Sequence, residues 1–115
     1  MPATTESAFY RVAQEALANI ARHARAQHAH VSLRRENGWL ILEVTDDGAG
    51  FDVAQVMSWR QCSLGIWGMR ERMALVGGEL IIESQLGKGT RLIARAPIMS
   101  EGSNGYDKDT GVDRR

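Results

Sequence analysis

The sequence contains little of what several protein classes depend on. It has one cysteine, Cys62, which excludes an intramolecular disulfide framework and a zinc site built from several cysteines. Its 14 basic and 14 acidic residues leave no formal net charge, whereas non-specific nucleic-acid binders usually carry a basic excess. No apolar run approaches the ~20 residues that a membrane-spanning helix needs. We therefore expect a protein of a reducing, cytoplasmic compartment that does not bind nucleic acid directly.

Proline is scarce, whereas glycine is not. The chain has 2 prolines and 12 glycines, and most of the glycines fall between Gly48 and Gly89. Its 115 residues, of which 43% are hydrophobic, suffice for one domain with a modest core. The N-terminus has neither the basic region nor the apolar region of a signal peptide. Residues 100–115 are too polar to bury a core, so we expect one domain over residues 1–99 and a disordered tail.

A helix is predicted over about residues 5–25 by apolar residues at helical spacing. This stripe consists of Phe9, Val12, Ala13, Ala16, Leu17, Ile20 and Ala24. A second helix is predicted over residues 66–76, where the pair Gly77-Gly78 ends it.

Four segments have the composition of strands, namely residues 30–35, 39–45, 80–84 and 90–96. Asn37-Gly38 between the first two predicts a tight hairpin, because both turn positions need a positive φ. The expected fold class is α+β, a two-layer α/β sandwich with helices packed on one face of a mixed, mostly antiparallel sheet.

Three polar residues share one face of the first predicted helix. Glu15, Asn19 and His23 are spaced by four residues and so form one row. Carboxylate and amide oxygens can hold Mg²⁺ directly or through water, and Mg²⁺ needs few protein ligands when phosphates supply the others. The row taken alone favours a solvated polar face in which Arg11 and Glu15 form an ion pair.

Two further polar segments follow predicted strands. Asp46, Gly48 and Gly50 come directly after a buried strand, where a carboxylate can accept a hydrogen bond from an exocyclic amine and glycines admit a flat ring. The alternative for this segment is an ordinary Asp-Gly turn. The segment Gly87-Lys88-Gly89-Thr90 joins two strands and precedes no helix, so it is not a P-loop and could be a plain hairpin loop.

Gly65 and Gly68 open the second predicted helix, and backbone N–H groups at a helix N-terminus favour phosphate. A glycine pair before a helix is also common without any ligand.

The order of these four elements resembles one family closely. Over roughly residues 6–98 the sequence is similar to the ATP-binding catalytic domain of two-component sensor histidine kinases, in the GHKL (Bergerat-fold) ATPase superfamily. Residues 11–24 resemble the N box of the subgroup typified by nitrate sensors and the membrane-fluidity thermosensor. Residues 46–50 resemble the G1 box, residues 65–72 the G2 box and residues 87–90 the G3 box.

The resemblance implies roles for individual residues. Asn19 would coordinate the Mg²⁺ that bridges the ATP phosphates, and Glu15 would order the water shell of that metal or polarise the reaction centre. His23 would contact a phosphate or the lid over the nucleotide. Asp46 would read the adenine amino group, and Thr90 would reach the adenine side.

The glycines and the segment between the boxes also acquire roles. The nucleotide would be approached by Gly48, Gly50, Gly65, Gly68, Gly87 and Gly89. Residues 51–64 would form a short ATP lid, with Ser63 where many relatives carry glycine.

The resemblance also implies partners that lie outside this chain. Each of His23, His28 and His30 is followed by alanine or valine, whereas the family's phosphoacceptor histidine is followed by an acidic residue. The chain would therefore be a protein-histidine kinase catalytic domain that binds ATP and Mg²⁺ and phosphorylates a histidine on separate dimerisation helices. The phosphate would then pass to a response regulator with a helix-turn-helix output domain.

The isolated domain would be a monomer, and the full-length kinase would be membrane-anchored. Two alternatives remain: a serine protein kinase of the anti-sigma-factor type in the same superfamily, and a nucleotide-free pseudokinase module.

Overall fold

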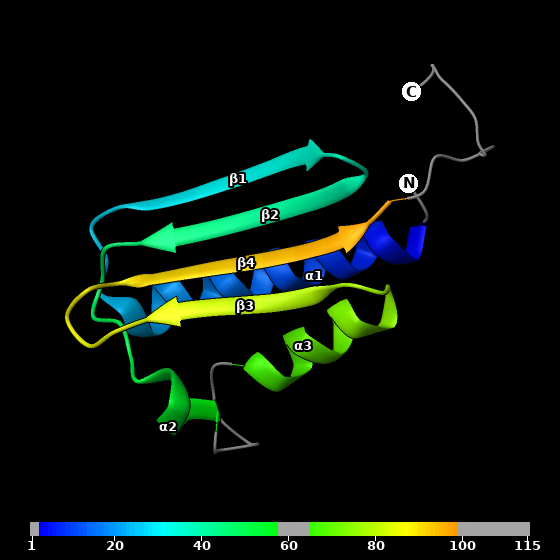
Figure 1. Ribbon diagram of the computed structural model, residues 1–115. Coiled ribbons are helices and arrows are strands. Elements are labelled where there is room, and N and C mark those ends of the chain that lie inside the picture. Colours follow the sequence, from blue (N-terminus) through cyan, green and yellow to red (C-terminus); the bar gives the residue numbers. More distant parts are fainter. Residues whose placement is uncertain (1–2, 58–64, 99–115) are drawn as a thin grey trace.

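The computed structural model describes residues 3–57 and 65–98 (Figure 1). Its elements in chain order are α1 (Ala3–Asn19), the π-helical turn η1 (Ile20–Ala24), β1 (Ala29–Glu36), β2 (Trp39–Asp46), α2 (Val53–Met57), α3 (Ile66–Leu75), β3 (Glu79–Ser84) and β4 (Thr90–Pro97). The helix α3 and the strands lie within a few residues of the predicted ranges, and α1 together with η1 covers the range predicted for the first helix. The short α2 falls in the segment expected to be the lid.

The strands form one sheet with the order β1-β2-β4-β3. All three pairings among these strands are antiparallel, so this part of the chain contains no parallel pair. The predicted hairpin between β1 and β2 is confirmed, because Asn37 and Gly38 have φ values of 52° and 82°. The N–H of Ile98 donates to the carbonyl oxygen of Gly38 at 2.8 Å, which fastens the end of β4 to this turn.

The helices lie on one face of the sheet, as the two-layer prediction required (Figure 1). From α1 the core receives Phe9, Val12 and Ala16, and from α3 it receives Ile66, Met69 and Met73. The sheet contributes Leu40, Leu42, Val44, Leu80, Leu92, Ala94 and Ala96. Because strand side chains alternate between faces, each of these sheet residues points toward the helices. We call this the inner face of the sheet.

The outer face carries a row of alternating charges, one residue per strand. Arg34 on β1 donates to Glu43 on β2 at 3.1 Å, and Arg91 on β4 donates to Glu43 at 2.6 Å and to Glu83 on β3 at 3.1 Å. The hydrogen bonds that Glu43 accepts from Arg91, the larger cause, and from Arg34 lower the pKa of Glu43. Ion pairs near the surface each contribute little to stability. Because opposite charges face each other only in this alignment of the strands, the row mainly favours this register over a shifted one.

The first helix differs from its prediction in two respects. Leu17 was expected in the apolar stripe, but it is 44% exposed. It lies about 100° round the helix from the buried Ala16, at the margin of the stripe. In addition, α-helical geometry ends at Asn19 and continues as the π-helical turn η1, after which Arg25 adopts a left-handed φ of 53°. Such turns are frequent at functional sites.

Some predictions lie outside the described residues. These are the disordered tail over residues 100–115, Ser63, and the part of the expected lid that covers residues 58–64. Within residues 3–57 and 65–98, no helix is long and apolar enough to cross a lipid bilayer.

Candidate functional site

Three polar residues form a row at one end of the inner face. Asp46 on β2 is the register partner of Thr90 on β4, and Thr90 is in turn the register partner of Ser84 on β3. Each belongs to the inner-face alternation of its strand, as do Val44, Leu92 and Ile82. The sheet therefore places the predicted base-binding pair, Asp46 and Thr90, on adjacent strands.

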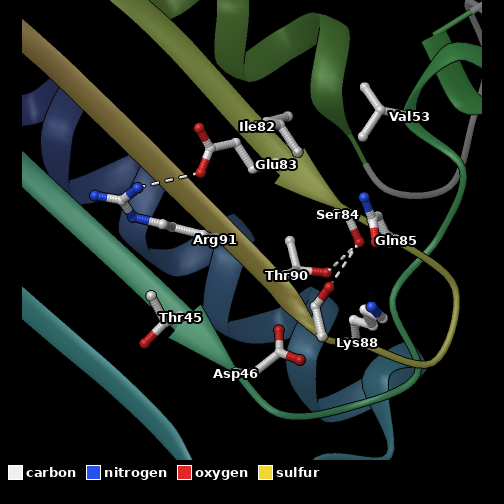
Figure 2. Close-up of a pocket in the computed structure, with 11 residues that line it drawn as sticks. Thr45, Asp46, Val53, Ile82, Glu83, Ser84, Gln85, Lys88, Thr90 and Arg91 are labelled. Carbon is white, nitrogen blue, oxygen red and sulfur yellow. Dashed lines mark hydrogen bonds and ion pairs between the residues drawn. The ribbon is translucent and has the colours of Figure 1, made fainter.

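A pocket of about 560 Å³ opens at this end of the sheet, and Asp46, Ser84 and Thr90 line it (Figure 2). Its volume lies within the range of small-molecule sites. Val53 from α2 and Lys88 from the β3–β4 loop also line it. One oxygen of Asp46, Oδ1, accepts a hydrogen bond from the N–H of Gly48 at 2.8 Å, which fixes the orientation of the carboxylate.

Ser84 is a site residue that sequence reasoning missed. Its hydroxyl oxygen lies 2.9 Å from the carbonyl oxygen of Gly89 and 2.8 Å from Oγ1 of Thr90 (Figure 2). It also accepts a hydrogen bond from the N–H of Phe51 at 2.9 Å. It thereby connects the start of the predicted lid to the β3–β4 loop. The available signal was the strand alternation, because Ser84 shares its side of β3 with Leu80 and Ile82.

Two predicted glycines permit the loops around this pocket to touch. A Cβ on Gly89 would lie 2.2 Å from the carbonyl oxygen of Asp46, and a Cβ on Gly50 would lie 2.0 Å from that of Gln85. Both residues also have positive φ, 77° and 66° respectively. Only glycine satisfies both conditions, so the sequence encodes the contact between the two loops.

Asp47, next to the predicted base-reading Asp46, has a different task. Its Oδ1 accepts hydrogen bonds from the N–H groups of Gln27 and His28, both at 2.9 Å. Its Oδ2 lies 2.9 Å from Nδ1 of His28. The backbone hydrogen bond from His28, followed by the bond to its ring, lowers the pKa of Asp47 to about 2. Asp47 thus fastens the chain that leaves η1 to the loop that leaves β2.

The predicted metal-binding row lies on α1. Glu15 and Asn19 are both half-buried, one turn apart. Within residues 3–57 and 65–98, Glu15 forms an ion pair with Arg22 at 3.6 Å, rather than with Arg11. A Cβ on Gly65 would lie 2.7 Å from Oε2 of Glu15, so the start of α3 lies against this carboxylate. The fold therefore brings the first glycine of the predicted G2 box to the N box.

The positions of the other predicted site residues add less to the site. Gly68 lies in α3 and Gly87 in the β3–β4 loop, and a Cβ on either would meet no heavy atom within 4 Å. His23 lies in η1, and its side chain is outside the described part of the structure. Within that part, no three histidine, cysteine, aspartate or glutamate residues are grouped as a metal site.

The layered fold places these polar residues at one end of the sheet, and comparison with known proteins gives the family. Residues 4–100 match the family described as histidine kinase-, DNA gyrase B-, and HSP90-like ATPase, and the chain belongs to it. The resemblance inferred from the four sequence elements is thereby confirmed at the level of the family.

Curated relatives that are similar in sequence are named as histidine kinases. The signal transduction histidine-protein kinase/phosphatase DegS of Brevibacillus brevis is 35% identical over 87% of this chain and 25% of its own length. The sensor histidine kinase LiaS of Bacillus subtilis is 36% identical over 93% of this chain and 29% of its own length. The chain thus spans little more than a quarter of these relatives.

Solved structures share the fold. The blue-light activated histidine kinase EL346 of Erythrobacter litoralis superposes with a TM-score of 0.71, at 23% identity, over 85% of this chain and 32% of that one. The ATP binding domain of PrrB from Mycobacterium tuberculosis superposes with a TM-score of 0.62, at 21% identity, over 79% of this chain and 67% of that one.

Proposed function

We propose that this chain is the ATP-binding catalytic domain of a sensor histidine kinase. The observation that carries the proposal is the row of Asp46, Thr90 and Ser84 at the mouth of a pocket, in a chain of this ATPase family. The names of the curated relatives favour a histidine kinase over the serine kinase alternative. The resemblance of residues 11–24 supports a place in the nitrate-sensor and thermosensor subgroup.

The proposed nucleotide pose follows from where the groups lie. The adenine amino group would donate to Asp46, whose carboxylate is already oriented by Gly48. Thr90, on the neighbouring strand, would contact the same edge of the base. The phosphates would extend toward Gly65 and Gly68 at the start of α3, where backbone N–H groups favour anions.

The residues of α1 fit a magnesium ion. Glu15 and Asn19 offer oxygen donors on one helix face, and Mg²⁺ commonly takes one or two protein oxygens together with phosphates and water. When bound, the ion neutralises charge on the phosphates during phosphoryl transfer. The chain's own contribution would be to orient these oxygens, and the ion pair with Arg22 and the close approach of Gly65 would restrict the Glu15 carboxylate.

The phosphate would be transferred to a histidine that this chain does not supply. We propose that the acceptor lies on dimerisation helices of the full-length kinase, and that a response regulator with a helix-turn-helix output domain receives the phosphate next. The isolated domain would be a monomer of the cytoplasm, and membrane anchoring would belong to other parts of the kinase.

Base recognition is tested by calorimetric titration with a non-hydrolysable ATP analogue. We expect Asp46→Asn to weaken binding about 10- to 100-fold, because a hydrogen bond to a charged acceptor is lost. Glu79→Gln is the matched control, since this carboxylate pairs with Arg95 on the outer face. Wild-type protein that is folded yet binds no ATP analogue would contradict the proposal.

The metal assignment is tested by repeating the titration with and without Mg²⁺. Asn19→Ala should remove most of the gain in affinity that Mg²⁺ gives, while binding without the ion changes little. Gln14→Ala, which also removes an amide from α1, should leave that gain intact. An equal loss in the presence and absence of Mg²⁺ would show that Asn19 does not serve the ion.

A further inference from the structure

The hydroxyl group of Ser84 uses its whole hydrogen-bonding capacity inside the protein. A serine hydroxyl has one proton to donate and two lone pairs that accept. The three neighbours of Ser84 Oγ are the N–H of Phe51, the carbonyl oxygen of Gly89 and Oγ1 of Thr90, all within 2.9 Å. The three partners therefore occupy the one proton and both lone pairs of Ser84, so its hydroxyl cannot also form a hydrogen bond to a ligand.

The chemistry of these partners fixes the direction of each bond. The amide of Phe51 can only donate, so Ser84 accepts from it. The carbonyl oxygen of Gly89 can only accept, so the single proton of Ser84 goes to it. The bond between Ser84 and Thr90 must then be donated by Thr90. The hydroxyl proton of Thr90 thus points along the sheet toward β3.

This direction decides what Thr90 presents to the pocket. With its proton committed to Ser84, Thr90 offers lone pairs only. Its register partner Asp46 is a carboxylate and also only accepts, with Oδ1 already engaged by Gly48. Two acceptors therefore stand side by side at the pocket mouth, and together they select a base edge that carries hydrogen-bond donors.

We propose that Ser84 is a positioning residue that sets base specificity by holding the Thr90 proton away from the nucleotide. The inference rests on the proposed ATP site and concerns how that site discriminates among purines. A 6-amino purine presents N–H donors to Asp46 and Thr90. A 6-keto purine presents an oxygen there, and that oxygen would face two acceptors with no proton between them.

Removing the Ser84 hydroxyl should therefore weaken ATP binding and also reduce the discrimination between 6-amino and 6-keto purines. Without it the Thr90 hydroxyl can rotate and donate to a 6-keto oxygen. The probes are ATP and inosine triphosphate, which differ at position 6 of the purine and the adjoining ring nitrogen. The quantity measured is the ratio of their dissociation constants with the 115-residue chain. We expect Ser84→Ala to lower the preference for ATP about 3- to 10-fold, the worth of one hydrogen bond.

A double-mutant cycle separates this role from a purely structural one. Thr90→Val should lower the preference by itself, and adding Ser84→Ala to it should change the ratio less than about twofold, because Ser84 acts through Thr90. Ser84→Thr keeps a hydroxyl and should retain the wild-type ratio. If Ser84 merely holds the Phe51 and Gly89 backbones, its effect will be the same with and without the Thr90 hydroxyl, which overturns the proposal.

The outcomes distinguish this inference from the function on which it rests. If wild-type protein binds ATP and folded Ser84→Ala keeps the full preference for ATP over inosine triphosphate, the inference is wrong and the ATP site stands. If wild-type protein binds neither nucleotide, both are wrong. Should Ser84→Ala fail to fold, Ser84→Cys carries the same test, since a thiol accepts hydrogen bonds poorly and should also lower the ratio.

Discussion

At the scale of single residues, the glycines of the β3–β4 loop offer a controlled comparison. Gly87 and Gly89 both have positive φ, 81° and 77°. They differ in the space around them, because a Cβ on Gly87 meets nothing within 4 Å and one on Gly89 meets the carbonyl oxygen of Asp46 at 2.2 Å. Backbone strain is thus common to both positions, whereas the clash is confined to one.

We expect Gly87→Ala to lower the free energy of unfolding by about 1 kcal/mol, the cost of a left-handed alanine. Gly89→Ala should cost at least about 2 kcal/mol more, because the loop must also move away from Asp46. Urea denaturation of the two variants measures the difference. Equal losses would mean that the contact between the loops is not maintained in solution.

The carboxylate of Asp47 gives stability a defined pH dependence. Its pKa is lowered from 3.8 to about 2 by hydrogen bonds from His28 and Gln27. The folded protein therefore releases this proton more readily than the unfolded chain does. The resulting stabilisation is fully present above about pH 4 and is lost as the pH falls toward about 2.

Asp47→Asn should accordingly unfold at a lower urea concentration than wild type at pH 5, and the two midpoints should converge as the pH approaches about 2. Glu71→Gln, which removes an exposed carboxylate from α3, controls for the change in net charge. A midpoint difference that stays constant from pH 5 to about 2 would contradict the assigned pKa.

The sequence alone pointed to the site residues that belong to short motifs. Asp46, Gly50 and Gly89 were singled out because short motifs carry them. Asp46 and Gly89 line the pocket, and Gly50 lies against the lining residues Gln85 and Gly89. Ser84 and Asp47 were missed. Strand alternation indicated the face on which Ser84 lies, but the partners Phe51 and His28 are 33 and 19 residues away, so no local pattern predicts these contacts.

At the scale of elements, β1 and β2 show how position in the sheet decides what an apolar side chain contributes. Leu33 and Leu42 are register partners on the inner face. Leu42 is 4% exposed, whereas Leu33 is 60% exposed, because the helices cover β2 and leave β1 open. The same residue type on paired positions thus has two environments.

Leu42→Ala should lower the free energy of unfolding by about 2–5 kcal/mol, since it leaves a cavity beneath α1. Leu33→Ala should cost less than about 1 kcal/mol, because little buried surface is lost. Thermal or urea denaturation of the pair provides the measurement. A large loss for Leu33→Ala would indicate that something covers this face in solution.

The elements themselves were largely predictable, because each has a local signal. Helical spacing predicted α1 and α3, and Asn37-Gly38 predicted the first hairpin. The π-helical turn after Asn19 was not predicted, since residues 20–24 continue the spacing of an ordinary helix. The exposure of β1 was also unpredictable, because Val31 and Leu33 alternate as buried residues do.

At the scale of the whole molecule, the sheet order β1-β2-β4-β3 could not be obtained from local signals. The two outer pairings are hairpins between consecutive strands, and the sequence marks both. The central pairing of β2 with β4 spans α2 and α3, and the hydrophobic pattern of either strand is equally compatible with other neighbours.

That central pairing has a consequence for how the molecule forms. The two hairpins can assemble early because each closes a short loop, whereas joining β2 to β4 closes a long one and should come later. Asp46 lies on β2 and Thr90 on β4, so this last pairing brings them together. The proposed nucleotide pocket is therefore complete only when the two halves of the sheet have joined. A nucleotide bound between the two strands would resist their separation, so binding at the proposed site and folding should be thermodynamically linked.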